Sequence, residues 1–430
     1  MTSNKSTFAC LAVLTASLIL CIRPTITSTY AQHEGPLTAF LGTGLLLLVL
    51  TMLGCRKLNC TYAHFGMTTA ALLMTGTASS LPLLYYTSAY DTAMIEQYAK
   101  EITISIGVSL LCIFLTWALI PFLEHLLQRF PKLCSFVFSG AMFLLAAVIL
   151  VCSDASANTT IVFGIQIALP AMAMLVIGTA AAFRMESGVG KCMTALGCAG
   201  CAGALIIRNE TGIPLLFYAA LLIWYALFCK KKHRILNIAL PVLPIAGFGV
   251  LYLWHCTSAY LPQALQSNFL SQLSHKIVGR LLTQEVEQSA NALKSIQHGG
   301  WFGSSTYDVY VSEASSDFAL STILHYCGGA FLILLLTAAL PFFWMGASHH
   351  CRTRNRFSDM LSSLSFVVFA VMLFYNLLMV LGIFPILGVQ APFTGSSVLC
   401  SALSGFLLGA AIYPQELAEK IQLQMKGEFQ

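Results

Sequence analysis

Apolar stretches of about twenty residues recur along nearly the whole chain, and this repetition restricts the folds open to it. One such stretch, coiled as a helix, is long enough to cross the roughly 30 Å hydrocarbon core of a bilayer. Only 9% of the 430 residues are charged and 57% are hydrophobic, whereas a soluble domain carries about 25% charged residues. We therefore predict an all-α, polytopic integral membrane protein, and the soluble classes of protein are excluded.

The apolar runs predict about 12 transmembrane helices. Their expected ranges are 7–22, 37–54, 66–86, 102–123, 134–152, 161–183, 192–207, 213–229, 236–256, 318–345, 361–383 and 395–413. The first is the shortest and has the length of a signal sequence. No clear small-residue cleavage site follows it, so we interpret it as a membrane helix.

Charge alternates between the two sides of this arrangement. Most of the 22 lysines and arginines fall in connections on the same side as the N-terminus, which predicts that both termini are cytoplasmic. The net charge of +5 thus reflects topology, and no nucleic-acid partner is expected. Most acidic residues lie in the outer connections, so a catalytic site is expected on that side.

One connection, residues 257–317, is far longer than the others, and connections of that size are usually functional. Apolar residues recur at helical spacing through its first part, which predicts amphipathic helices along the outer membrane surface. A glycine-rich turn follows at Gly299, Gly300 and Gly303, and the segment Glu313 to Phe318 then leads into the next apolar helix.

These residues resemble the long extracellular loop of the SEDS family (shape, elongation, division and sporulation; the RodA and FtsW type). That family has a Gly-Gly-x-x-Gly turn and then a Pro-Glu-x-His-Thr-Asp-Phe run that opens a helix. Here Glu313, Asp317 and Phe318 keep that spacing, with Ser315 and Ser316 in place of the His and Thr.

A second match lies near the C-terminus, where the family pattern is Asn-x-x-Met-x-x-Gly-x-x-Pro-x-x-Gly-x-x-x-Pro-Phe. The corresponding residues are Asn376, Met379, Gly382, Pro385, Gly388, Pro392 and Phe393. Agreement in register at seven positions is much more specific than one short motif. The run Arg208 to Gly212 is similar to the family's Pro-Asp-Leu-Gly stretch, with Glu210 in place of the Asp.

The resemblance covers residues 66–413, a ten-helix membrane domain, which leaves 1–65 as a two-helix N-terminal extension and 414–430 as a cytoplasmic tail. It implies a peptidoglycan glycosyltransferase that polymerises lipid-linked disaccharide (lipid II) at the outer face of the bacterial cytoplasmic membrane, in division or elongation. The implied partners are lipid II, a class B penicillin-binding protein acting as transpeptidase, and other proteins of the division or elongation machinery.

Asp317 is the candidate catalytic residue, because a carboxylate within hydrogen-bond reach of a sugar hydroxyl can act as its general base. An Asp just before a helix is also a good N-cap, and that interpretation stays open. Glu313, Gly299 and Gly300 are candidates for substrate binding. For Glu313 the alternative is a solvated loop carboxylate, and for the glycines a backbone turn that side chains would block.

Departure of a lipid pyrophosphate requires positive charge, from Lys or Arg or from a divalent cation such as Mg or Mn. The outer candidates are Lys100, Arg208, Lys276, Arg280 and Lys294, and the residues do not specify a metal. Arg208 and Glu210 lie in a short outer loop, where they either form a structural ion pair or line a polar cavity.

Three alternatives stay open. The first is a flippase for the same lipid-linked precursor, and the second is a catalytically inactive scaffold of the wall-synthesis machinery. The third is a lipid-linked sugar polymerase or ligase of another multi-helix family. The scaffold is considered because the family's Arg-Trp pair is replaced here by Thr159 and Thr160.

Overall fold

The computed structural model describes residues 3–27, 61–88, 92–152, 161–162, 165–185, 188–208, 210–229, 247, 250–257, 271, 274, 278, 286–304, 306, 309–350 and 356–413. The helices predicted over 37–54 and over most of 236–256, and the first part of the long connection, fall outside this part of the chain. So do Lys276 and Arg280.

Helices make up most of the described residues. Their bounds are α1 (Ser3–Thr27), α3 (Thr61–Ser88), α4 (Thr92–Arg129), α5 (Pro131–Cys152), α6 (Ala168–Arg184), α7 (Gly188–Ile207), α8 (Gly212–Trp224) continued by a π-helical turn (Tyr225–Cys229), α13 (Val286–Gly299), α14 (Ala319–His350), α15 (Phe357–Val380) and α16 (Val398–Ala411).

Five described segments are long and apolar enough to cross a membrane: Lys100–Arg129, Pro131–Cys152, Gly188–Ile207, Ala319–His350 and Phe357–Val380. Shorter apolar helices cover Phe8–Ile22, Ala168–Arg184, Gly212–Phe228 and Val398–Ala411. Every backbone N–H and C=O inside a bilayer must be satisfied within the protein, and helices do this with local hydrogen bonds. The prediction of an all-α, polytopic membrane protein is confirmed.

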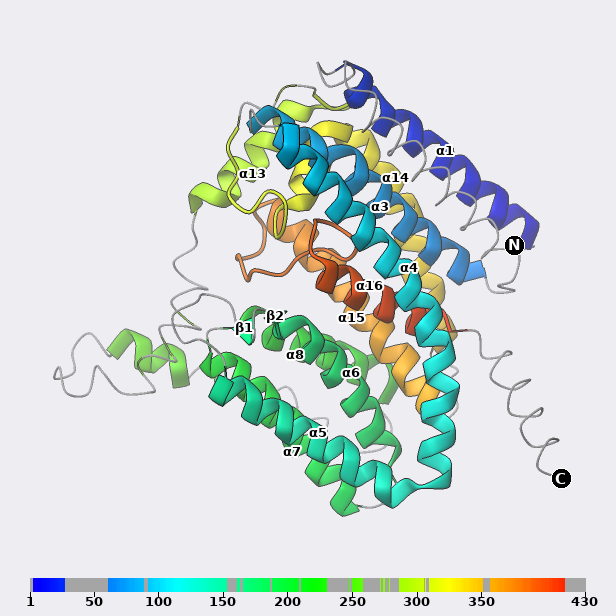
Figure 1. The fold of residues 1–430 in the computed structure, drawn as a ribbon, viewed down its shortest axis with the longest axis vertical. Coiled ribbons are helices and arrows are strands. Elements are labelled where there is room, and N and C mark those ends of the chain that lie inside the picture. The colour runs from blue at the N-terminus through cyan, green and yellow to red at the C-terminus, as the bar shows by residue number, and fades with distance from the viewer. Residues whose placement is uncertain are drawn as a thin grey trace.

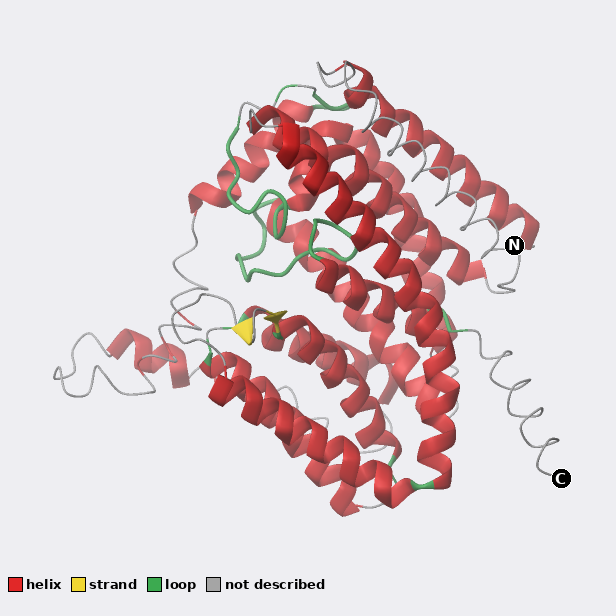
Figure 2. Cartoon of the chain, viewed as in Figure 1, coloured by secondary structure: helices red, strands yellow, loops and turns green. Residues whose placement is uncertain are grey.

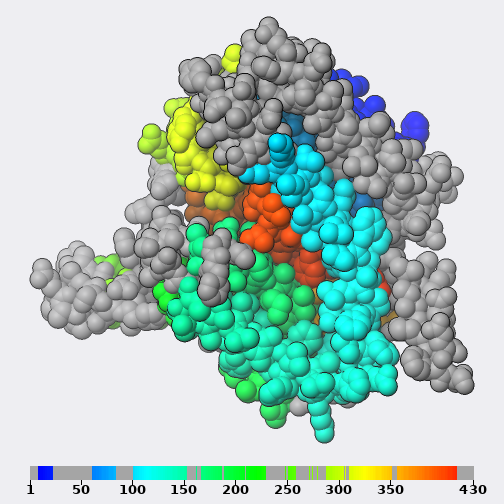
Figure 3. Space-filling model, in the orientation of Figure 1, coloured from blue at the N-terminus to red at the C-terminus, as the bar shows by residue number. Residues whose placement is uncertain are grey.

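The helices form two groups joined by a central layer. Figure 1 shows α5, α6, α7 and α8 on one side of the molecule and α1, α3 and α14 on the other, with α4, α15 and α16 between them. In the space-filling view the C-terminal segment, coloured orange-red, lies between the cyan surface of α4 and the green surface of the first group (Figure 3). The central layer therefore carries the contacts that hold the two groups together.

Small residues and polar side chains join the central helices. A side chain at Gly405 would overlap the Ser109 carbonyl oxygen, so the backbones of α16 and α4 are in direct contact there. The Ser109 hydroxyl donates to the Ser401 carbonyl (3.0 Å), and the Trp117 indole N–H donates to that of Gly409 (2.9 Å). Close backbone approach and hydrogen bonds between helices are the usual means of association where water does not drive apolar groups together.

Two features differ from the expected helix pattern. The predicted helix 161–183 begins late, because Ile161–Val162 and Ile165–Gln166 pair as a short antiparallel hairpin and α6 starts only at Ala168. This hairpin is the β-structure of the described residues (Figure 2). Also, α14 is interrupted at Gly328, whose φ of 79° and ψ of 177° are not helical.

Candidate functional site

Asp317 ends a compact turn that leads into α14. Glu313 has a φ of 56°, a left-handed conformation that non-glycine residues adopt rarely. Its carbonyl accepts the amides of Ser316 and Phe318, both at 3.0 Å, and its carboxylate accepts the Ser316 hydroxyl at 2.7 Å. The turn is thus closed on itself, and it determines where the chain enters the helix.

Asn376 anchors this turn from the core. Its side chain is fully buried in α15, and its amide nitrogen donates to the Asp317 carbonyl at 2.8 Å and to the Val389 carbonyl at 2.7 Å. Both amide protons are used, and each hydrogen bond satisfies a carbonyl near the membrane domain's interior. Asn376 therefore fixes Asp317 against the segment that follows α15.

That segment, residues 381–397, passes directly beside the Asp317 carboxylate. Gly388 has a φ of 64°, and a Cβ there would lie 3.4 Å from Asp317 Oδ2. Gly395 approaches the same turn more closely, since a Cβ would be 2.6 Å from the Ser315 carbonyl oxygen, which also accepts the Ser396 amide at 3.3 Å. The second sequence motif thus forms one wall of the site.

Other helices hold segment 381–397 in place. The Thr77 hydroxyl of α3 donates to the Phe393 carbonyl (3.1 Å), and the Ser105 hydroxyl of α4 donates to the Ser396 carbonyl (2.9 Å). At the start of α8, a side chain on Gly212 would overlap the Leu387 carbonyl. Because contacts from three helices converge on it, an irregular segment keeps one conformation here.

Two other carboxylates, Glu313 and Glu210, lie near enough to Asp317 for their charges to act on it. Burial, and after it the negative charges of Glu313 and then Glu210, together raise the pKa of the Asp317 carboxyl to about 6. Glu210 is itself buried, just before α8. A carboxylate with a pKa near 6 is still ionised at neutral pH and is a stronger base than an ordinary aspartate.

The Asp317 carboxylate does not cap α14. The first-turn amides bond to backbone carbonyls instead: Ala319 to Ser316 at 3.2 Å, Ser321 to Phe318 at 2.9 Å and Thr322 to Phe318 at 3.3 Å. Within the described residues no hydrogen bond to the carboxylate is formed. The geometry therefore leaves its oxygens able to accept a proton from a ligand.

The glycine turn docks onto the break in α14 through backbone hydrogen bonds. The amides of Gly329 and Ala330 donate to the carbonyls of Gly300 (2.8 Å) and Trp301 (3.0 Å). A Cβ on Gly303, whose φ is 82°, would overlap the Tyr326 carbonyl. Gly299 also faces α14 backbone, whereas Gly300 has open space where a side chain would be.

His325 is a residue of this region that our sequence analysis missed. Its side chain is fully buried in α14, with Nε2 2.7 Å from the Thr306 carbonyl oxygen and Nδ1 2.7 Å from that of Ser295. The ring thus joins α13 and the loop after the glycine turn to α14. The only signal in the sequence was a histidine within an apolar helix, which does not reveal its partners.

Of the candidate cations, Lys100, Arg208 and Lys294 are among the described residues. Lys100 on α4 and Lys294 on α13 are exposed, and the Arg208 guanidinium donates to the Leu150 carbonyl. Among the described residues none of the three forms a hydrogen bond or ion pair with Glu313 or Asp317. In the same part of the chain no three His, Cys, Asp or Glu side chains are placed to hold a metal ion.

The fold and the site together define the class of this protein: it is a polytopic membrane protein with a half-buried carboxylate at one end of its helix bundle. Residues 66–415 match the sequence model of the FtsW/RodA/SpoVE family, described as cell cycle proteins. The chain belongs to this family, which relates to bacterial cell-wall synthesis.

A solved structure supports the same fold. The chain resembles one from the study "Structural coordination of polymerization and crosslinking by a peptidoglycan synthase complex", with a TM-score of 0.53 and 17% sequence identity. The alignment covers 80% of this chain and 96% of the other. No curated protein sequence gives a match.

Proposed function

We propose that the protein is a peptidoglycan glycosyltransferase that polymerises lipid II at the outer face of the cytoplasmic membrane, with Asp317 as its general base. One observation carries this proposal: Asp317 is held by Asn376 against Gly388, with its carboxylate available and its pKa raised to about 6. Support also comes from the family, and from the resemblance to a chain of a peptidoglycan synthase complex.

In the proposed step the Asp317 carboxylate takes the proton of the acceptor sugar hydroxyl as that oxygen attacks the anomeric carbon of the donor. The bond from this carbon to the lipid pyrophosphate breaks, and the pyrophosphate leaves with the bonding electrons. A general base of this kind contributes about 10² to 10⁴ in rate. Low dielectric at the rim strengthens its interaction with the developing charge.

The substrate also suits the position of the site. A lipid-linked sugar has an apolar tail and a polar head, and Asp317 lies where a polar turn meets an apolar helix long enough to cross a membrane. We place this end of the bundle outside the cell, with both termini in the cytoplasm, because lysines and arginines gather at the opposite end. A class B penicillin-binding protein would crosslink the strands, as the partner.

The test is polymerisation of purified lipid II by the detergent-solubilised full chain, supplied with its transpeptidase partner. Asp317→Asn is expected to lower the rate at least about a hundredfold while the chain stays folded, because the amide cannot accept the proton. Glu287→Gln is the matched control, since Glu287 is an exposed carboxylate on α13. It is expected to keep the wild-type rate.

Equal polymer from the wild type and Asp317→Asn would remove Asp317 from the mechanism. Absence of polymer from the wild type, with lipid II crossing liposome membranes in its presence, would favour a flippase. Absence of both activities, with the transpeptidase still bound, would favour a scaffold.

A further inference from the structure

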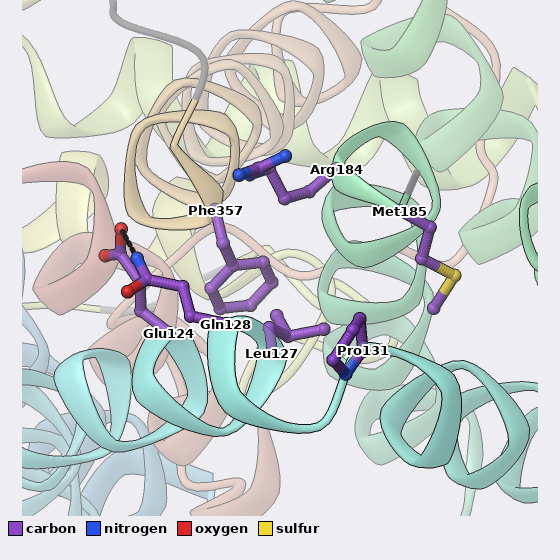
Figure 4. Close-up of a pocket in the computed structure, with 7 residues that line it drawn as sticks. All are labelled: Glu124, Leu127, Gln128, Pro131, Arg184, Met185 and Phe357. Atoms are coloured by element: carbon purple, nitrogen blue, oxygen red, sulfur yellow. Dashed lines mark hydrogen bonds between the residues drawn. The ribbon is translucent and has the colours of Figure 1, made fainter. Parts of the chain in front are cut away.

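A second polar site lies at the far end of the bundle. Asn376 contacts Asp317, and α15 begins at Phe357, so the start of α15 is about 28 Å from the candidate catalytic turn along the helix. At that end the last turn of α4, the first residue of α5, the end of α6 and the start of α15 enclose a cavity of about 170 Å³. Its lining residues are Glu124, Leu127, Gln128, Pro131, Arg184, Met185 and Phe357 (Figure 4).

Two opposite charges line this cavity, and among the described residues neither has a close partner of opposite charge. Glu124 is 2% exposed, and its hydrogen bond from Gln128 Nε2 is long, at 3.5 Å. The Arg184 guanidinium forms no hydrogen bond or ion pair within the described part of the chain. Figure 4 shows Glu124 to the left of the Phe357 ring and Arg184 above it. Glu124 is buried and Arg184 is half-buried. Charges removed from water are costly unless they are paired, so a ligand carrying both signs would match this site.

The surface beside the cavity is apolar and faces outward. Phe130, Leu133 and Phe136 are 45%, 58% and 77% exposed, on the junction of α4 and α5. Arg129 and Lys132 are exposed at the same level. Basic residues next to exposed aromatic and aliphatic side chains are typical of the boundary between membrane and water. The cavity therefore opens at the depth of lipid headgroups.

We propose that this cavity binds the headgroup of a phospholipid that carries both a phosphate and a primary ammonium, with its acyl chains along Phe130, Leu133 and Phe136. Arg184 binds the phosphate, because a guanidinium matches its oxygens. Glu124 accepts hydrogen bonds from the ammonium. The cavity is smaller than the roughly 300–1,000 Å³ pockets that hold drug-sized ligands, which suits a headgroup.

The first test uses the wild-type full chain and a series of headgroups. Nanodiscs or micelles would contain equal amounts of phosphatidylethanolamine, its mono- and dimethylated forms, phosphatidylcholine and phosphatidylglycerol, and native mass spectrometry would measure the lipid retained. Retention is expected to fall at each methylation, by about tenfold or more across the series, because each methyl removes a donor to Glu124. Preferred retention of phosphatidylglycerol would overturn the proposal, as would equal retention of all five lipids.

Variants separate the two charges. Glu124→Gln should bring phosphatidylethanolamine and phosphatidylcholine close to equal retention, whereas Arg184→Gln should lower the retention of both by about tenfold. Lys132→Gln is the control, an exposed cation on the same junction but outside the cavity lining, and should leave the pattern unchanged. If Lys132→Gln has the effect of Arg184→Gln, surface charge explains binding and the proposal fails.

The same ammonium and phosphate occur in soluble glycerophosphoethanolamine. Adding this compound at the same concentration as the lipid, and measuring how much lipid stays bound, distinguishes a membrane lipid from a soluble ligand. Failure to displace the lipid supports the membrane source, and complete displacement would overturn it in favour of a soluble ligand.

Discussion

At the residue scale, the candidate site depends on how a few polar groups are satisfied. Asn376 uses both amide protons on backbone carbonyls, whereas the Asp317 carboxylate accepts no hydrogen bond within the described residues. Of the two serines that replace the family's His and Thr, Ser316 donates its hydroxyl to the Glu313 carboxylate, whereas Ser315 contributes its backbone carbonyl, which accepts the Ser396 N–H. The Ser316 side chain thus helps to close the turn that holds Asp317.

The raised pKa of Asp317 predicts a pH-dependent effect on stability. Its carboxyl has a pKa of about 6 in the folded protein, above its ordinary value of 3.8. The folded state therefore binds the carboxyl proton of Asp317 more tightly than the unfolded state does. Above pH 6, where the group is ionised, this difference lowers the free energy of unfolding by at most about 3 kcal/mol. Asp317→Asn is expected to raise the melting temperature at pH 7.5, with a difference that shrinks as the pH falls toward 4.

Thermal unfolding in detergent at several pH values would measure this difference. Glu287→Gln, the exposed control, should show no such dependence. A lower melting temperature for Asp317→Asn at pH 7.5 would show that the carboxylate stabilises the fold, contrary to the geometry.

At the scale of elements, the break in α14 is matched to the glycine turn. Residues 300–304 pair with the backbone on both sides of Gly328, through the bonds from Gly329, Ala330 and Ser304. In a continuous helix those backbone N–H and C=O groups would bond to one another, and none would be left to pair with the glycine turn. The pairing therefore couples the long connection to the helix that begins beside Asp317.

Substitution at the docking point should be costly. In Gly303→Ala the Cβ would overlap the Tyr326 carbonyl, and the left-handed φ of 82° adds strain, so we expect a loss of about 2 to 4 kcal/mol and reduced polymerisation. Gly300→Ala is the matched control. It shares the positive φ, at 57°, but has open space around it, and should lose about 1 kcal/mol. Thermal unfolding and polymer yield would be measured for both variants. Equal losses in Gly303→Ala and Gly300→Ala would argue against the docked geometry of the turn.

At the scale of the whole molecule, segments distant in sequence assemble one site. Glu210, the turn 313–317 and segment 381–397 meet at one rim, although the helices between them belong to different groups. The N-terminal helix α1 is also part of this body, since it packs on α3 and α14 (Figure 1). Its Leu14 and Cys21 are buried in the common core.

Packing of α1 predicts unequal effects of substitutions on its two faces. Leu14→Ala, at a side chain 3% exposed, should destabilise the protein by about 2 to 4 kcal/mol by leaving a cavity. Ile19→Ala, at a side chain 66% exposed on the same helix, should change stability by less than about 0.5 kcal/mol. Thermal unfolding of the two variants checks this, and similar losses would indicate that α1 is not docked as described.

The amino-acid sequence by itself determined the membrane class, the approximate helices and the motif residues, because hydropathy over twenty residues and short spacings are local properties. The predicted helix 161–183 was wrong only at its start, where Ile161–Val162 and Ile165–Gln166 form a hairpin that an apolar run does not distinguish from a helix; from Ala168 on the helix is present. The break at Gly328 and the roles of His325 and Asn376 were decided by tertiary structure. Their hydrogen-bond partners lie on other elements, and only the packed bundle determines which buried groups meet.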